Sequence, residues 1–82
     1  MEVTLKPLDP RHVVNTKHEH PWFYEWIEKN GIKDGEYKGY CDGKLRIHQV
    51  FKKGKLHGKE TYYDEDGKIE VVNFYTNGKQ FY

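Results

Sequence analysis

Glycines recur with one spacing through the last two thirds of this 82-residue sequence, and this spacing limits the possible folds more than any other feature. Gly31, Gly54 and Gly78 lie 23 and 24 residues apart. Residues 35–44 and 58–68 also agree in residue type, with one residue inserted before the second Asp-Gly pair. A period in this range predicts a repeat architecture, in which each unit buries apolar surface against its neighbours.

Two-residue turn signals separate the strand-like segments of this region. A type I′ turn needs positive φ at both central residues, so Asp-Gly and Asn-Gly pairs are strong hairpin signals. They predict an antiparallel β-meander of consecutive hairpins over residues 35–82, with five strands of which the last is a stub at Lys79–Tyr82. The turn pairs are Asp42-Gly43, Lys53-Gly54, Asp66-Gly67 (in a longer loop) and Asn77-Gly78.

Alternation divides the side chains of each predicted strand between two faces. One face carries Ile47 and Phe51, and one repeat later it carries Val71 and Tyr75. We expect this face to form the core. The opposite face includes Arg46 and is mixed in character, so we expect it to stay partly solvated.

Residues 1–34 lack the glycine spacing and are expected to form a cap on the sheet within one structural domain. Residues 21–30 fit two structures. As a short helix, they place Pro21 in the first turn, gather Trp22 and Trp26 on one stripe and stop at Asn30-Gly31. As a strand, they occupy the place of residues 49–51 one repeat earlier. The helix is favoured because its apolar stripe is cleaner, and it would cap the open end of the sheet.

Residues 51–68 resemble a MORN repeat, in the variant found in bacterial and viral proteins, including those labelled YwqK-type antitoxins. The shared pattern is an aromatic residue, two residues, Gly54, two residues, His57, Gly58, an aromatic strand and then Asp-Gly. A degenerate copy precedes it and a truncated one follows, so the resemblance covers about residues 29–82. It implies an elongated antiparallel sheet with rows of aromatics and glycines that serves as a scaffold, a dimerisation module or a protein-binding module.

The composition argues against catalysis. The chain has no serine, which removes serine-nucleophile mechanisms, and its single cysteine, Cys41, has no suitable base or oxyanion site suggested nearby. We therefore expect no enzyme, no catalytic residue and no cofactor. A lone cysteine, the absence of a signal-like N-terminus and the absence of a long apolar run predict a cytoplasmic protein with no transmembrane segment.

Thirteen aromatic residues are more than a sheet of this size can hide, so we expect some of them to contact a partner. The function predicted is non-enzymatic binding of another protein, as a small inhibitor, an immunity-type protein or a viral or phage accessory protein. Lys79–Tyr82 ends in mid-repeat, which predicts an unpaired edge that binds a partner strand or forms a homodimer. The candidate contact residues are Trp22, Trp26, Tyr40, Phe51, Tyr62, Tyr63, Phe74, Phe81 and Tyr82.

Two weaker alternatives remain. Net charge is only +1, but one stretch is basic and suggests binding of nucleic acid or anionic lipid, although the acidic stretch 60–70 offsets its field. His18 and His20 are weak metal candidates, because zinc needs further ligands and a polar loop explains them equally well. No metal is therefore expected. The basic residues are Lys44, Arg46, Lys52, Lys53, Lys55 and Lys59.

Overall fold

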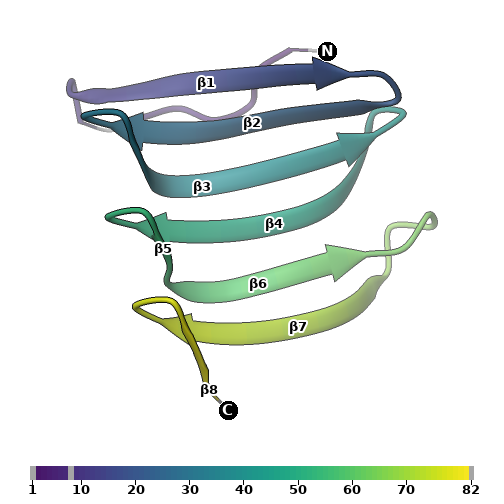
Figure 1. Ribbon diagram of the computed structural model, residues 1–82. Helices are drawn as coiled ribbons and strands as arrows, with labels where there is room; N and C mark the ends of the chain where they lie inside the picture. Colours follow the sequence, from purple (N-terminus) through teal and green to yellow (C-terminus); the bar gives the residue numbers. More distant parts are fainter. Residues whose placement is uncertain (1, 8, 82) are drawn as a thin grey trace.

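The computed structural model describes residues 2–7 and 9–81, and its strands form one antiparallel sheet (Figure 1). The chain runs back and forth between neighbours, as the hairpin signals predict, in the order β1-β2-β3-β4-β6-β7-β8, with β5 paired to β4. No helix occurs among the described residues. The strands are β1 (His12–Glu19), β2 (Trp22–Lys29), β3 (Ile32–Cys41), β4 (Lys44–Lys52), β5 (Lys55–Leu56), β6 (Gly58–Tyr63), β7 (Ile69–Thr76) and β8 (Lys79–Phe81).

Four hairpins close with two residues that both have positive φ, the geometry of a type I′ turn. Glycine takes the second place in each of them. The first places are held by Asn30, Asp42, Lys53 and Asn77, with φ of 55°, 49°, 51° and 49°. Three of these turns lie along one edge of the sheet (Figure 1).

The glycine spacing appears in the structure as a contact between successive turns. The Gly54 N–H donates to the carbonyl oxygen of Lys33 at 2.8 Å, and the Gly78 N–H donates to that of Leu56 at 2.8 Å. Donors and acceptors are both about one repeat apart in the sequence. Each turn is therefore anchored to the strand that follows the previous turn on the same edge.

Residues 22–29 form strand β2 and not the helix that their aromatic stripe favours. Burial alternates along β2, with Phe23, Glu25 and Ile27 buried and the residues between them half-buried. Strands β1 and β3 pair with it on either side, so cross-strand hydrogen bonds and packing override the helical pattern. The sheet consequently starts at His12, inside the segment expected to be a cap.

The most buried apolar side chains lie on the opposite face from the one expected. Leu5, Phe23, Ile27 and Tyr40 are 5–8% exposed, and the last three share one side of β2 and β3 in the strand register. We call this side the covered face, because residues 2–7 (the N-terminal segment) lie against it. The expected core face is wrong as a core, since Val71 on that side is 42% exposed; we call it the open face.

Glu25 fixes the N-terminal segment to the covered face. Its side chain is fully buried and accepts hydrogen bonds from Thr4 N–H (2.8 Å), Thr4 Oγ1 (2.6 Å), Leu5 N–H (3.0 Å) and the Tyr40 hydroxyl (2.8 Å). Burial alone raises the pKa of Glu25, but these hydrogen bonds outweigh it and hold the pKa below its ordinary value. A buried carboxylate with four donors is thus the polar centre of the core.

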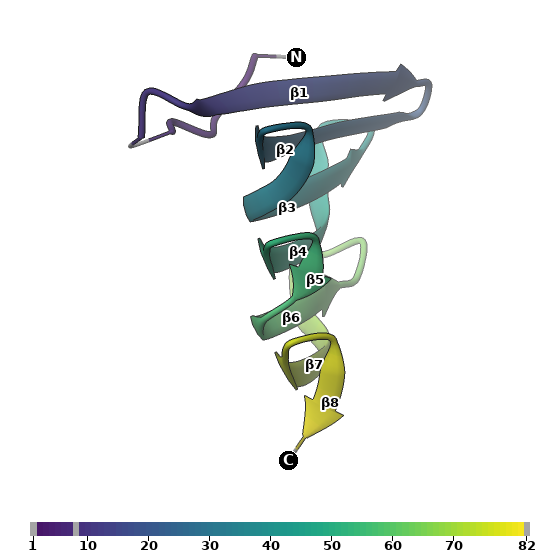
Figure 2. The same cartoon turned by 60° about the vertical axis from the view of Figure 1, so that its left-hand side comes forward.

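The remaining part of the sheet is a single layer. The overall extents are 34 × 33 × 19 Å, and the view turned by 60° shows β4 to β8 continuing away from the N-terminal segment (Figure 2). A layer without a second sheet or helix leaves much of its side-chain surface accessible. The open face is therefore the larger candidate surface for binding.

Candidate binding face

A cluster of aromatic rings covers the open face of β2, β3 and β4. Trp22 and Tyr24 stack with centroids 5.8 Å apart and planes 6° apart. Tyr24 lies 6.1 Å from Tyr37, which also contacts Trp26 (5.9 Å) and Phe51 (6.0 Å). Strand alternation on β2 and the register with β3 and β4 bring these rings together.

Gly39 leaves a gap in this aromatic surface. It pairs with Tyr24 on one side and with Ile47 on the other. A Cβ at this position would lie 2.5 Å from the Ile47 Cγ2 and 3.2 Å from the Tyr24 ring. The glycine therefore lets both neighbouring side chains lie low over β3, and the sheet surface is depressed there.

Beside this gap the open face is hollowed. The hollow has a volume of about 450 Å³, within the range typical of ligand pockets. It joins the aromatic cluster to the C-terminal strands and carries one cationic and one anionic side chain. Its lining consists of Trp22, Tyr24, Tyr37, Arg46, Ile47, Tyr62, Tyr63, Glu70 and Val71.

Glu60 anchors Tyr62, one of the residues that line the hollow. Its side chain is 3% exposed and accepts hydrogen bonds from Asn73 Nδ2 (3.0 Å), the Tyr75 hydroxyl (3.4 Å), the Tyr62 hydroxyl (3.3 Å) and Gln49 Nε2. These donors come from β4, β6 and β7. The network holds the Tyr62 ring in place, while that residue remains 37% exposed.

Two tyrosines of the open face, Tyr37 and Tyr62, have raised pKa values and are neutral hydroxyl donors at physiological pH. Burial raises the pKa of Tyr37, and the neighbouring Tyr24 adds to this effect. Burial also raises the pKa of Tyr62, assisted by the charge of Glu60. Arg46 donates from Nε to the Tyr63 carbonyl oxygen at 2.9 Å, which fixes its position at the hollow.

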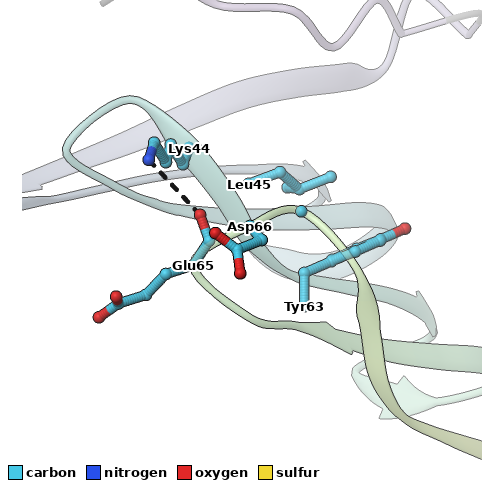
Figure 3. A pocket seen from close by; sticks show the side chains of 6 residues that line it. Lys44, Leu45, Tyr63, Glu65 and Asp66 are labelled. Atoms are coloured by element: carbon cyan, nitrogen blue, oxygen red, sulfur yellow. Dashed lines mark hydrogen bonds between the residues drawn. The ribbon is translucent and has the colours of Figure 1, made fainter.

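A larger hollow of about 550 Å³ lies outside the open face, at the β6–β7 loop (Figure 3). Its walls are the β6–β7 loop and the adjoining ends of β4 and β6, and Lys44 Nζ donates to the Glu65 carbonyl oxygen at 3.4 Å. Asp64 shapes the same loop by accepting from the N–H groups of Asp66 and Lys68 at 2.9 and 3.0 Å. The acidic residues here serve the turn, and the hollow offers few converging groups to a ligand.

The structure divides the candidate contact residues between the two faces. Trp22, Trp26 and Phe51 belong to the aromatic cluster, while Tyr62 and Tyr63 line the hollow. Tyr40 is buried at 7% exposure in the core and offers no free surface. Phe74 and Phe81 are exposed, and they contact each other at 6.4 Å on the side of the covered face. Tyr82 lies outside the described residues.

Tyr24 and Tyr37 are central to the open face but were missed as contact residues. Tyr24 stacks on Trp22, and Tyr37 contacts Trp26 and Phe51, all three of which the sequence singles out. Period-two spacing from Trp22 and Trp26 would have found Tyr24 if residues 22–29 had been taken as a strand.

The basic stretch does not form one patch. Lys44 and Arg46 lie at one end of β4, whereas Lys52, Lys53 and Lys55 surround the turn at its other end. Strand geometry of about 3.3 Å per residue separates these groups by roughly 20 Å or more. Lys59 lies on β6 and is exposed.

The histidine pair is also divided. The His18 ring packs on Phe23 with centroids 4.6 Å apart, and His20 lies in the β1–β2 turn. Among the described residues, no group of three or more His, Cys, Asp or Glu side chains is placed to hold a metal ion.

In comparisons with known proteins, no protein-family model, no curated protein and no solved structure matches the chain. In the described part of the chain, no helix has the length and apolar character needed to cross a membrane.

Proposed function

We propose that this chain is a non-enzymatic protein-binding module whose contact surface is the open face. The hollow of about 450 Å³ carries the proposal. Interface hot spots are enriched in Trp, Tyr and Arg that sit in desolvated pockets near the centre of a contact. Trp22, Tyr24, Tyr62 and Arg46 meet that description around one depression.

The hollow is prepared for binding before a partner arrives. Arg46 is hydrogen-bonded to the β6 backbone, and Tyr62 is linked to buried Glu60. Side chains that are already ordered lose less conformational entropy when a partner binds. The exposed Glu70 carboxylate and the Arg46 guanidinium give the rim both signs of charge, which favours a partner segment with an apolar centre and polar flanks.

We propose that the module is of the MORN-like class. The glycine spacing and the rows of aromatic residues support this. A small inhibitor, an immunity-type protein or a viral or phage accessory protein acting inside the cell fits such a module. The Lys79–Phe81 strand at the sheet edge is a second proposed contact, for a partner strand or a homodimer.

Site-specific photo-crosslinking tests the open face. A photoreactive phenylalanine analogue replaces Tyr62 in one variant and Ile32, which is 50% exposed and lies away from both proposed contacts, in the control variant. Crosslinking in the native host should give a discrete adduct from position 62, and Val71→Asp in the same chain should abolish it. Equal adducts from both positions, or an adduct that persists with Val71→Asp, would contradict the proposal.

Light scattering separates self-association from capture of another protein. A monomer of the full chain has a mass of 9.9 kDa, and a homodimer through β8 should fall to the mass of one shortened chain when residues 79–82 are deleted. Dimerisation that survives the deletion excludes the edge as its cause. The scattered arrangement of the basic residues gives no specific support to nucleic acid or anionic lipid as the partner.

A further inference from the structure

The ammonium group of Lys33 lies within a cage of three aromatic rings on the open face. Its Nζ is 5.7 Å from the Trp26 ring centroid, 5.0 Å from that of Tyr37 and 5.2 Å from that of Phe51. All three distances are within the range of a cation–π contact. The rings come from β2, β3 and β4, so the cage exists only when these strands are paired.

The cage is held in shape by its own contacts. Trp26 and Tyr37 lie 5.9 Å apart, and Phe51 meets Tyr37 edge-on at 6.0 Å with planes 65° apart. The indole Nε1 of Trp26 donates to Glu28 Oε2 at 2.6 Å. Glu28 is the cross-strand partner of Lys33 in the register, so a carboxylate borders the cage at its Trp26 side.

We propose that this cage recognises a methylated lysine side chain of a protein partner and that Lys33 is its internal competitor. The kind of occupant is visible in the structure, because a four-carbon stem with a terminal cation already fits there. This proposal rests on the proposed function in one respect, which is that the methylated lysine belongs to a protein partner. It identifies a second feature of the open face, which adjoins the hollow and shares Tyr37 with it.

Selectivity follows from the competition. Lys33 is part of the chain, and a tethered group of this kind competes at an effective concentration on the order of millimolar. An unmodified lysine offers the same compact, strongly hydrated ammonium and gains nothing by replacing it. A trimethylammonium group is held less firmly by water and fills the space between rings, which is the basis of recognition by aromatic cages. Lys33 thereby prevents the binding of unmodified lysine, which is far commoner than the methylated form.

The test follows the indole N–H signal of Trp26 by NMR. The chain has two tryptophans, and Trp22→Phe identifies which signal belongs to Trp26. Four probes are titrated: the N-acetyl amides of trimethyllysine and of unmodified lysine, a neutral tert-butyl analogue of the trimethyl compound, and phosphatidylcholine vesicles. The proteins are the full chain, Lys33→Ser, Lys33→Gln (which keeps most of the stem) and Phe51→Leu.

Trimethyllysine should move the Trp26 signal of the full chain and bind Lys33→Ser about tenfold more tightly, because the competitor is gone. Phe51→Leu should weaken that binding at least severalfold, while unmodified lysine and the neutral analogue bind far less tightly. Equal binding of the neutral analogue, or no shift with either Lys33 variant, overturns the proposal. Binding of the vesicles in preference to trimethyllysine overturns its assignment to a protein side chain.

The same titration distinguishes this inference from the proposed function. Val71→Asp alters the hollow and leaves the cage residues intact, so trimethyllysine should still shift the Trp26 signal. Loss of the photo-crosslink with retained trimethyllysine binding supports both proposals, and a crosslink without any trimethyllysine binding overturns only the cage. Circular dichroism of each variant confirms that the sheet is folded before its titration is interpreted.

Discussion

Replacing Glu25 by glutamine should weaken the attachment of the N-terminal segment and lower the free energy of unfolding by about 2–4 kcal/mol. The carboxylate accepts two backbone N–H groups on Oε1 and two hydroxyls on Oε2. A hydrogen bond to a charged group contributes about 1.5–3 kcal/mol and a neutral one about 0.5–1.5 kcal/mol. The glutamine side chain keeps one oxygen for the N–H groups of Thr4 and Leu5, and the hydroxyls rotate to accept from its nitrogen. The loss is therefore about 1 kcal/mol for each backbone bond, and more if the hydroxyl bonds also weaken.

Thermal melts followed by circular dichroism measure this loss. For a domain of this size, about 2 kcal/mol corresponds to a drop in Tm of roughly 8–16 °C. Glu70→Gln removes the same charge at an exposed position and should change Tm by much less. Amide hydrogen exchange gives a local readout, because the N–H groups of Thr4 and Leu5 should exchange faster in Glu25→Gln and not in the control.

The pH dependence has a definite sign. The pKa of Glu25 in the folded chain is below its ordinary value, so its carboxylate stabilises the fold fully above the unfolded pKa of about 4.3. That contribution is lost as the pH falls through the folded pKa. The difference in unfolding free energy between the natural chain and Glu25→Gln should therefore be constant near neutral pH and become smaller as the pH falls below the unfolded pKa. A gap that does not change between neutral and strongly acidic pH, or equal melting of Glu25→Gln and Glu70→Gln, would refute the reasoning.

Three further changes are checked by urea unfolding. Gly39→Ala should cost about 1–3 kcal/mol, because the new Cβ would meet the Ile47 methyl at 2.5 Å; an unchanged midpoint would contradict the close approach. Lys53→Asn should stabilise by about 0.5–1 kcal/mol, since Asn tolerates the φ of 51° better than Lys; a loss of stability would count against the turn type. Asp64→Ala should cost about 1 kcal/mol by freeing two loop N–H groups, and Glu65→Ala should cost less than half of that if the loop depends on Asp64.

The hairpins were predictable from the sequence because their signals are local. Asp42-Gly43 and Asn77-Gly78 specify positive φ at two neighbouring positions, and nothing distant is needed to interpret them. The strands between these turns follow from alternation. Even the unfavourable Lys53 is placed correctly, because the glycine after it marks the turn.

Strand β2 and the core could not be derived in the same way. Trp22 and Trp26 have a spacing that suits a helical stripe as well as a strand, and only pairing with β1 and β3 decides between them. Glu25 looks like a solvated residue in the sequence. Its donors come from Thr4, Leu5 and Tyr40, which are 15 to 21 residues away, so its burial is a property of the tertiary structure.

An exposed aromatic surface was predictable from the sequence, whereas the arrangement of its rings was not. Aromatic excess predicted an exposed ring surface, and Trp22, Phe51 and Tyr62 lie on it. The cage around Lys33 left no trace in the sequence pattern, because its three rings are contributed by three strands whose register must be known first. Spacing along one strand does not reveal a group assembled across several.

The bonds from Gly54 to Lys33 and from Gly78 to Leu56 also determine how the molecule can change in length. Each bond joins a turn to a carbonyl about one repeat earlier, so a tandem copy of residues 55–78 brings with it both the acceptor and the donor that it needs. Gain or loss of one whole unit leaves every remaining contact of this kind intact. An insertion of any other length separates a turn from its carbonyl, and an odd number of residues inserted within a strand also moves side chains from one face to the other. Variation in the size of such chains is therefore expected in steps of 23 or 24 residues, the spacings between Gly31, Gly54 and Gly78.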